Sequence, residues 1–243
     1  MDKNRADMRL NQFMASCGIC SRREADRMIE AGKVTVDGRP AVPGMRVSGQ
    51  EEIRLGGRRL AGRQTRTVVA FYKPYGVTCT RKDPHAERTL EDVFTYPVRL
   101  TYAGRLDKDS EGLLLMSNDG VLIDAMMRGA NGHEKEYIVR VKSRITDADL
   151  ERMRKGVRLR DLDVTTRPCR VERLGDFTFR IILTQGLNRQ IRRMCRAVGN
   201  EVKKLKRVRV LNIELGSMKP GEMREITGSE FEELYRIAGC STE

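Results

Sequence analysis

Apolar positions in the first third of the chain recur with the period of two short helices and then of a short strand. The first helix face is formed by Leu10, Phe13, Met14 and Cys17. A second helix is expected to open at Ser21, because Ser21 and Glu24 have the spacing of a capping box, and to stop at Gly32. Val34–Val36 then alternates as a strand. The pattern predicts a small module of helices and strands.

Beyond residue 66 the pattern indicates a larger domain in which buried strands are interspersed with short helices. Strands are expected at 68–72, 113–116, 135–141 and 177–183. Helices are expected at 89–93, 121–127 and 146–155, within the segment 185–194, and after a capping box at Ser229–Glu232. The stretch 157–174 is expected to form short strands and turns at the edge of the sheet.

The stretch between the two regions is polar, basic and rich in glycine. It includes Gly56-Gly57-Arg58-Arg59 and Gly62-Arg63-Gln64-Thr65-Arg66, a composition typical of a flexible tether. We therefore divide the chain into a module at 1–60, a linker at 61–66 and a larger domain at 67–243. A chain of 243 residues is long enough for this division.

The charge of the chain indicates what kind of molecule it binds. It has 47 Lys and Arg against 34 Asp and Glu, a formal net charge of +13, which suits a polyanion and favours nucleic acid over an anionic membrane surface. No apolar run approaches the ~18 residues that span a bilayer. Residues 1–5 lack the apolar core of a secretory signal. We expect a cytoplasmic protein that does not associate with membranes.

Neither a metal nor an organic cofactor is expected. The six cysteines are scattered, and Cys17-Gly18-Ile19-Cys20 has no second pair to complete a zinc site. Residues 107–112 mimic the start of a calcium loop, but its twelfth position is Asn118 rather than glutamate, and apolar residues fill its middle. Phosphate-binding and dinucleotide-binding glycine motifs are absent from the sequence, which disfavours ATP, a dinucleotide or S-adenosylmethionine.

One stretch, from Tyr102 to Gly120, carries the candidate chemistry. Asp107 follows a cation and stands before a glycine-containing turn and the expected strand at 113–116. From these residues alone, a solvated loop with a capping aspartate is an equal alternative to a positioned catalytic carboxylate. Together, the sequences Gly104-Arg105-Leu106-Asp107, Ser110-Glu111-Gly112-Leu113-Leu114 and Asn118-Asp119-Gly120 resemble the catalytic motif of the RsuA/RluB/RluE/RluF-type pseudouridine synthases.

The N-terminal module also resembles a known unit. Its pattern of Ser21-Arg22-Arg23-Glu24-Ala25, Gly32, Val34 and Val36 is similar to the αL-type RNA-binding module shared with a small-subunit ribosomal protein. The resemblance implies that the helix bearing Arg22 and Arg23 faces RNA. A solvated helix face is the alternative interpretation of the same residues.

The family resemblance assigns roles to individual residues. It implies that Asp107 is the catalytic carboxylate, and that Arg192 pairs with Asp107 and keeps it ionised. Tyr137 would stack on the target base and Arg105 would fill the space that this base leaves. Further RNA contacts are expected from Leu106, Lys108, Leu187, Asn188, Arg189, Gln190, Leu205, Lys206, Arg207 and Val208. Without the resemblance, Tyr137 would be a half-buried strand residue and the basic run a solvated surface.

The implied protein is α+β, with a small N-terminal αL-type RNA-binding module and a catalytic domain whose mixed, mostly antiparallel sheet is flanked by helices. The implied reaction converts uridine to pseudouridine without a cofactor. Residues 133–137 and 185–190 resemble the RluF branch, whose members modify 23S rRNA near the peptidyl-transferase centre and the anticodon of a tyrosine tRNA. A monomer is expected. The alternative is a noncatalytic RNA-binding or ribosome-assembly factor.

Overall fold

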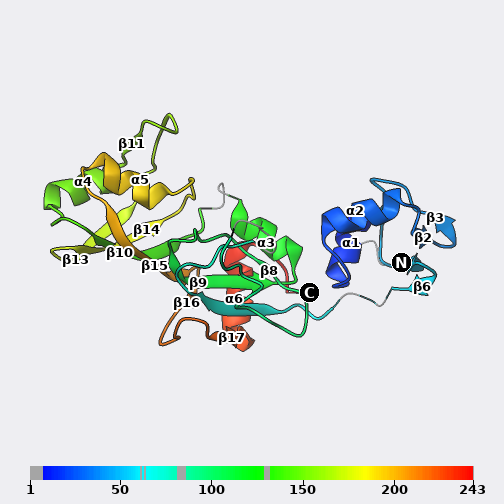
Figure 1. Ribbon diagram of the computed structural model, residues 1–243. Helices are drawn as coiled ribbons and strands as arrows, with labels where there is room; N and C mark the ends of the chain where they lie inside the picture. Colours follow the sequence, from blue (N-terminus) through cyan, green and yellow to red (C-terminus); the bar gives the residue numbers. More distant parts are fainter. Residues whose placement is uncertain (1–7, 61, 63, 81–85, 129–131, 243) are drawn as a thin grey trace. The chain divides into compact units, whose positions relative to one another are not determined.

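The structure of the protein, a computed structural model, describes residues 8–60, 62, 64–80, 86–128 and 132–242 (Figure 1). The described chain forms two compact units. The first consists of the described residues of Met1–Thr67 with Pro97–Leu100 and Asn118–Gly120, and the second holds those of Val68–Tyr96, Thr101–Ser117 and Val121–Glu243. Residues 61 and 63 of the expected linker lie outside the described residues.

The first unit packs two helices against short strands. They are α1 (Leu10–Ser16), α2 (Arg22–Glu30), β1 (Met8–Arg9), β2 (Val34–Val36), β3 (Arg39–Pro40), β4 (Arg46–Val47), β5 (Ile53–Leu55) and β6 (Arg58–Arg59). The antiparallel sheet has the order β3-β2-β5-β6, and β1 pairs with β4. The expected apolar face of α1 is confirmed, because Leu10, Phe13, Met14 and Cys17 are all buried.

Helix α2 begins and ends where the sequence predicts. The Ser21 hydroxyl accepts a hydrogen bond from the Glu24 amide at 3.2 Å, and the Glu24 carboxylate accepts one from the Ser21 amide at 2.7 Å. Both halves of the capping box are therefore formed. Gly32 follows the helix with a φ of +67°, a left-handed conformation that glycine adopts at little cost.

A mixed sheet forms the framework of the second unit (Figure 1). Its strands are β7 (Val68–Lys73), β8 (Thr101–Tyr102), β9 (Glu111–Ser117), β10 (Lys135–Val141), β13 (Arg170–Gly175), β14 (Thr178–Leu183), β15 (Val202–Val210), β16 (Ile213–Glu214) and β17 (Met223–Glu225). Their order is β13-β14-β10-β15-β9-β7-β17, with β8 on β9 and β16 on β15. Among the described pairs of this sheet, β9 and β15 are parallel and the rest antiparallel, which confirms the expected arrangement.

Helices pack on this sheet over two apolar cores. The remaining elements are α3 (Gly120–Met127), α4 (Asp147–Lys155), α5 (Gln190–Ala197), α6 (Gly228–Ala238) and the hairpin of β11 (Arg158–Leu159) and β12 (Val164–Thr165). Side chains of α3 and α6 pack with those of β7 and β9. Side chains of α4 and α5 pack with Val139 and Val141 of β10. Because strand side chains alternate between faces, β10 presents Tyr137 to the same face as Val139.

The parallel pairing of β9 with β15 requires glycine at one position. Gly112 lies opposite Arg207 in this pair and has a φ of +108°. A Cβ atom at Gly112 would lie 2.2 Å from the carbonyl oxygen of Arg207 and 2.8 Å from its amide nitrogen. No larger residue fits unless the two strands separate.

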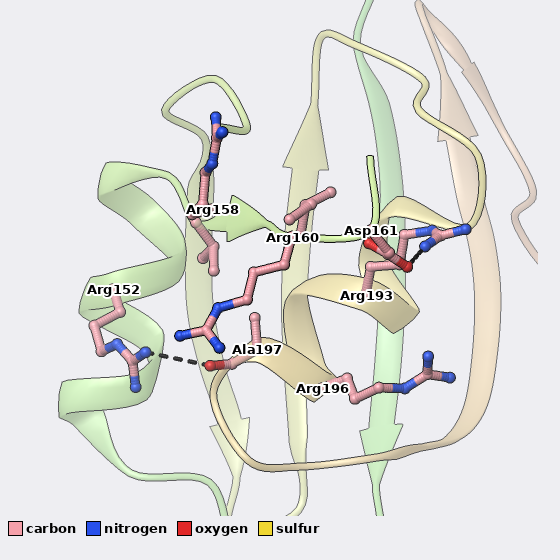
Figure 2. Close-up of a pocket in the computed structure, with 9 residues that line it drawn as sticks. Arg152, Arg158, Arg160, Asp161, Arg193, Arg196 and Ala197 are labelled. Carbon is pink, nitrogen blue, oxygen red and sulfur yellow. Dashed lines mark hydrogen bonds and ion pairs between the residues drawn. The ribbon is translucent and has the colours of Figure 1, made fainter. Parts of the chain in front are cut away.

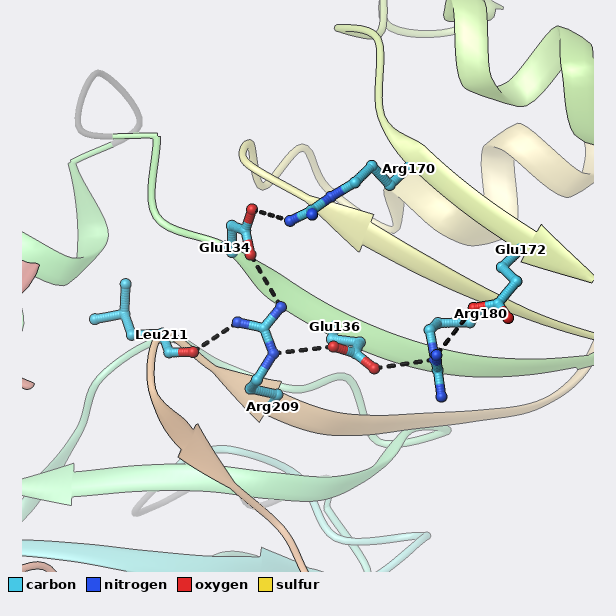
Figure 3. Close-up of polar contacts among 7 residues, drawn as sticks. All are labelled: Glu134, Glu136, Arg170, Glu172, Arg180, Arg209 and Leu211. Atoms are coloured by element: carbon cyan, nitrogen blue, oxygen red, sulfur yellow. Dashed lines mark hydrogen bonds and ion pairs between the residues drawn. The ribbon is translucent and has the colours of Figure 1, made fainter. Parts of the chain in front are cut away.

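An ion-pair ladder crosses the sheet on the face opposite α4 and α5 (Figure 3). It consists of Glu134, Glu136, Arg170, Glu172, Arg180 and Arg209. Arg209 donates to Glu134 and to Glu136, at 2.9 Å in each case. Arg180 lies 3.1 Å from Glu136. Its three glutamates balance its three arginines, so the ladder holds neighbouring strands together. Arg209 is thereby paired with carboxylates of the protein itself.

Two local expectations differ from the structure. Residues 89–93 form a turn rather than a helix, in which the amide and hydroxyl of Thr89 donate to the Asp92 carboxylate at 2.6 and 2.8 Å. Helix α6 begins at Gly228 after Thr227, without a side-chain hydrogen bond at its cap. The capping box predicted at Ser229–Glu232 is therefore wrong, because Ser229 already lies inside the first turn.

Candidate active site

Asp107 lies on the loop between β8 and β9, and hydrogen bonds fix the backbone of that loop. The Ala103 amide donates to the Leu115 carbonyl at 2.7 Å, and the Ser110 amide donates to the Asp107 carbonyl at 3.1 Å. Gly104 turns the chain with a φ of +89°. The Asp107 side chain is 37% exposed. Its carboxylate is thus accessible to a ligand while its backbone is held in place.

Two arginines at the start of α5 bind the acids of this loop. Arg189 precedes α5 in a left-handed conformation with a φ of +50°. Its guanidinium donates to both carboxylate oxygens of Asp109, at 3.0 and 2.7 Å, and lies 3.4 Å from the Asp107 carboxylate. The Nε of Arg192 lies 3.3 Å from the Asp109 carboxylate, and its Nη2 donates to the Asp109 carbonyl. Charge-assisted hydrogen bonds therefore join the loop to α5.

The predicted ion pair between Arg192 and Asp107 is corrected by this geometry. Within the described residues, Arg192 pairs with Asp109, and Arg189 is the arginine that contacts Asp107. Asp109 was not among the predicted site residues, although its position two residues after Asp107 was the available signal. The spacing alone does not show which of the two acids an arginine of α5 will reach.

The surroundings of Asp109 keep it ionised. Burial acts to raise the pKa of its carboxyl group, but the hydrogen bond from Arg189 and the charge of Arg192 outweigh this effect and hold that pKa below its ordinary value. Arg192 is 11% exposed, and burial lowers its pKa while the charge of Asp109 opposes the change. Asp109 is therefore the ionised carboxylate that holds the guanidinium groups of Arg189 and Arg192 in place.

Lys73 is fully buried close to the same loop. Its ammonium group donates to the carbonyls of Pro74 and Val77 at 2.9 and 2.8 Å. Burial lowers the pKa of Lys73 to about 8, although the charge of Asp107 acts in the opposite direction. The lysine therefore stabilises the turn that follows β7 through backbone carbonyls and not through a direct ion pair with Asp107.

Arg207 supports the loop from the sheet. It is 1% exposed, and its guanidinium donates to the carbonyls of Leu113 and Gly104 at 2.7 and 3.4 Å. In the strand register, Arg207 lies between Tyr137 of β10 and Gly112 of β9. Tyr137 is half-buried and packs against the core beneath α4 and α5. The register therefore places Tyr137 on the sheet beside the strand that follows Asp107.

The resulting site is a partly exposed carboxylate beside guanidinium groups, with a tyrosine on a neighbouring strand. Comparison with known proteins shows the family to which this site belongs. The RNA pseudouridylate synthase family matches residues 67–197, and the S4 domain family matches residues 8–53. The chain is also 42% identical over 238 residues to the dual-specificity RNA pseudouridine synthase RluF of Salmonella typhi, covering 97% of this chain and 81% of that protein.

The chain belongs to the RNA pseudouridylate synthase family. It is 32% identical over 238 residues to the ribosomal large subunit pseudouridine synthase B of Bacillus subtilis, with 95% and 96% of the two chains covered. A solved structure described as a pseudouridylate synthase superposes with a TM-score of 0.69 at 28% identity, covering 93% of this chain and 99% of that one. These likenesses confirm the expected family, the α+β fold with its RNA-binding module, and an isomerase acting on RNA uridine.

Some of the RNA contacts expected of this pseudouridine synthase lie at the described surface. Exposed or half-exposed are Arg22, Arg23, Arg105, Lys108, Leu187, Asn188 and Arg189. Arg105 and Lys108 flank Asp107 on its loop, and Asn188 and Arg189 directly precede α5. Four of these side chains therefore belong to the two segments that meet at the Asp107 carboxylate, and RNA contact by them stays a prediction.

Other predicted contacts of the synthase need correction, because their side chains are buried. Leu106, Gln190, Leu205 and Arg207 are at most 7% exposed. Leu205 belongs to the core beneath α4 and α5. Lys206 and Val208 are half-exposed, so RNA contact by them stays a prediction. Val208 also packs on the core of α3 and α6, and the Lys206 Nζ lies 6.0 Å from the ring centroid of Tyr72. Residues 205–208 therefore do not line one continuous RNA-contacting surface, because successive side chains of a strand point to opposite faces of the sheet.

The described residues hold neither a candidate metal site nor a membrane span. No group of three or more His, Cys, Asp or Glu among them is placed to bind a metal ion. Cys17 and Cys20 are buried in the core of the first unit and form no disulfide within the described chain. Within the described part of the chain, every helix is too short or too polar to cross a bilayer. A cofactor-free reaction stays an expectation for this synthase.

Proposed function

We propose that this synthase isomerises a specific uridine of large-subunit (23S) ribosomal RNA, and that the anticodon uridine of a tyrosine tRNA is a second substrate. The observation that carries the proposal is the Asp107 carboxylate, which is accessible, held on a fixed loop and contacted by Arg189. The relatives named for dual-specificity and for large-subunit activity support the choice of RNA. The enzyme acts as a monomer in the cytoplasm, where these RNAs are found.

The reaction needs few chemical groups. The bond between N1 of uracil and C1′ of the ribose breaks, the base turns, and a bond forms between C5 and C1′. The proton at C5 leaves and N1 gains one, so the product is an isomer of the substrate. An anionic nucleophile or base beside the sugar is required, and Asp107 has the accessible carboxylate for this role. Three routes are open to this anion: it attacks the sugar, it attacks the base, or it acts as the base that starts a glycal route.

The surrounding residues prepare the substrate for that step. The target base must leave its stack, which costs a few kcal/mol. Arg105 is exposed beside Asp107 and occupies the space that the base vacates. Tyr137 stacks on the extruded base and excludes water from it. Arg189 and Arg192, held by Asp109, keep positive charge beside the reacting carboxylate.

Replacement of the carboxylate tests the proposal. Asp107→Asn should abolish pseudouridine formation in a large-subunit rRNA transcript and leave RNA affinity nearly unchanged, because the amide has the same shape but cannot act as an anion. The matched control is Asp147→Asn, whose acid is 88% exposed in the first turn of α4, and its activity should equal that of the wild type. Turnover by Asp107→Asn at the wild-type rate would refute the assignment.

Pseudouridine mapping tests the choice of substrate. The purified enzyme is incubated with an unmodified 23S rRNA transcript and, separately, with a tyrosine tRNA transcript, and each product is sequenced for pseudouridine. One modified position in each RNA is expected. Binding of both RNAs without product would favour the alternative of a noncatalytic assembly factor, and product in the rRNA alone would overturn the tRNA half of the proposal.

A further inference from the structure

A second feature of the catalytic unit is a pocket of about 670 Å³ between α4, α5 and the β11–β12 hairpin (Figure 2). We call it the arginine pocket. Its charged lining consists of Arg152, Arg158, Arg160, Arg193, Arg196 and a single acid, Asp161. These side chains come from α4, from α5 and from the segment around β11, so separate parts of the fold bring the cations together.

Acids neutralise two of the five arginines. Arg193 forms an ion pair with Asp161 across the pocket lining, and Arg158 forms one with Asp163 in the turn of the hairpin. Figure 2 shows Arg158 turned away from the space between the helices, whereas Arg193 is held against Asp161. These two ion pairs stabilise the walls of the pocket. They leave the positive charges of the other three arginines without a neutralising ion pair.

The other three arginines form no ion pair with an acid among the described residues, although the charge of Arg196 also acts on Glu201, an acid outside the pocket that pairs with Lys142. Arg152 donates to the carbonyl of Ala197, the last residue of α5, at 3.2 Å. The backbone carbonyls of Arg160 and Arg196 accept from the amides of Asp163 and Gly199. Their side chains are exposed and form no hydrogen bond or ion pair within the described chain. In Figure 2 the guanidinium groups of Arg152 and Arg160 point into the same space between α4 and α5. Like charges so placed repel one another until an anion lies between them.

The lining indicates which anion the pocket takes. Guanidinium groups bind phosphate oxygens in bidentate geometry and are suited to nucleic-acid backbones. None of the nine residues that line the pocket is aromatic, so no ring is present on which a base could stack. A free nucleotide would therefore leave its base unbound, whereas a backbone phosphate needs only the cations.

We propose that the arginine pocket binds backbone phosphates of the substrate RNA beside the segment that carries the target uridine, an inference that rests on the proposed function. Helix α5 links the two places, because Arg189 and Arg192 at its start bind the acids of the Asp107 loop and Arg196 near its end lines the pocket. Its eight residues span about 12 Å. That length corresponds to a few nucleotides of a helical strand, since a B-form DNA strand rises about 3.4 Å per nucleotide and an A-form RNA strand rises less.

The test uses the whole protein and removes the two pocket arginines whose side chains form no ion pair or hydrogen bond. The variant Arg160→Gln/Arg196→Gln is compared with Arg140→Gln/Arg144→Gln, which removes the same charge from exposed arginines outside the pocket. A labelled RNA stem-loop taken from the modified region of the rRNA is titrated at several salt concentrations. The pocket variant should bind about tenfold more weakly and lose about 2 from the slope of log affinity against log salt, because each lost phosphate contact removes about 1.

Further readouts separate the possible outcomes. At saturating RNA, the pocket variant should retain the wild-type kcat, and Arg160→Lys/Arg196→Lys should recover most of the salt slope because it keeps the charges. An unchanged slope in the pocket variant, or an equal loss in the control variant, would overturn the proposal. Weaker binding of ATP without any change for RNA would also overturn it, in favour of a free nucleotide. Absence of pseudouridine with wild-type enzyme would instead refute the proposed function, because stem-loop binding is measured independently.

Discussion

At the scale of single residues, Gly112 carries a constraint that no side chain can meet. Its left-handed φ and the approach of the Arg207 backbone act together. We expect Gly112→Ala to destabilise the fold by at least about 3 kcal/mol, because both strain and overlap with backbone must be relieved. Thermal unfolding followed by circular dichroism measures the change.

Gly175 provides the control for this prediction. It lies in β13 without a left-handed φ, and a Cβ atom there would meet nothing within 4 Å. Gly175→Ala should therefore change stability by less than about 0.5 kcal/mol. Equal unfolding temperatures for the two variants would show that the β9–β15 pairing can relax, contrary to our expectation.

Lys73 gives a pH dependence whose sign is fixed by its burial. Its pKa is about 8 in the folded protein against an ordinary 10.5, so between these values the unfolded state binds more protons and the free energy of unfolding rises with pH. The rise amounts to roughly 3 kcal/mol. Below pH 8 both states are protonated and the contribution is constant.

Denaturant unfolding at several pH values tests this behaviour. The free energy of unfolding of the wild type, minus that of Lys73→Met, should rise from pH 8 towards pH 10.5, because titrations common to both proteins cancel. The variant is also expected to be less stable at its pH optimum, since the carbonyls of Pro74 and Val77 lose their donor. A difference that stays flat across this range would contradict the lowered pKa of the lysine.

At the scale of secondary-structure elements, the ion-pair ladder ties β10 to β15 through Arg209. This side chain is 19% exposed and bridges two glutamates, so Arg209→Gln should cost about 2 kcal/mol by leaving partly buried acids without their partner. Arg170 is 68% exposed and contacts the same ladder at Glu134. Arg170→Gln should cost less than about 0.5 kcal/mol, and urea unfolding of the two variants tests this ranking.

Elements with local signals could be predicted from the sequence. The Ser21–Glu24 capping box opens α2, and the alternation at 135–141 matches β10. The site was only partly predictable, because its contacts join distant residues. Arg189 and Asp109 are 80 positions apart, and Arg207 and Leu113 are 94 apart. No pattern of neighbouring residues in the sequence indicates that Arg192 pairs with Asp109 or that Arg207 is buried.

At the scale of the whole molecule, the net charge of +13 is distributed over both units, and each is expected to contribute to RNA affinity. Arg22 and Arg23 lie exposed in the first turn of α2. Arg22→Gln/Arg23→Gln should raise the KM for rRNA several-fold and leave kcat unchanged, because we expect the S4 module to position the RNA and Asp107 to perform the chemistry. Steady-state kinetics measures both constants.

The control for this prediction removes the same charge from the segment around β2 and β3 of the module. Lys33 and Arg39 are exposed, and Lys33→Gln/Arg39→Gln should leave KM within about twofold of the wild type if affinity depends on α2 and not on net charge alone. An equal rise of KM in both variants would show that the module attracts RNA only through its overall charge. A fall in kcat in the α2 variant would place these arginines closer to the chemistry than we expect.

The position of the parallel β9–β15 pair has a consequence for protein synthesis. The Asp107 loop and β9 leave the ribosome well before α5 and β15, which supply Arg189, Arg192 and Arg207 about 80 to 95 residues later. A nascent chain therefore carries the whole S4 module while the segment from Gly104 to Leu113 still lacks the three guanidinium groups that contact it in the folded protein. Contacts between residues so far apart in the sequence form slowly compared with local helices. Newly made enzyme is thus able to bind RNA before it becomes able to modify it.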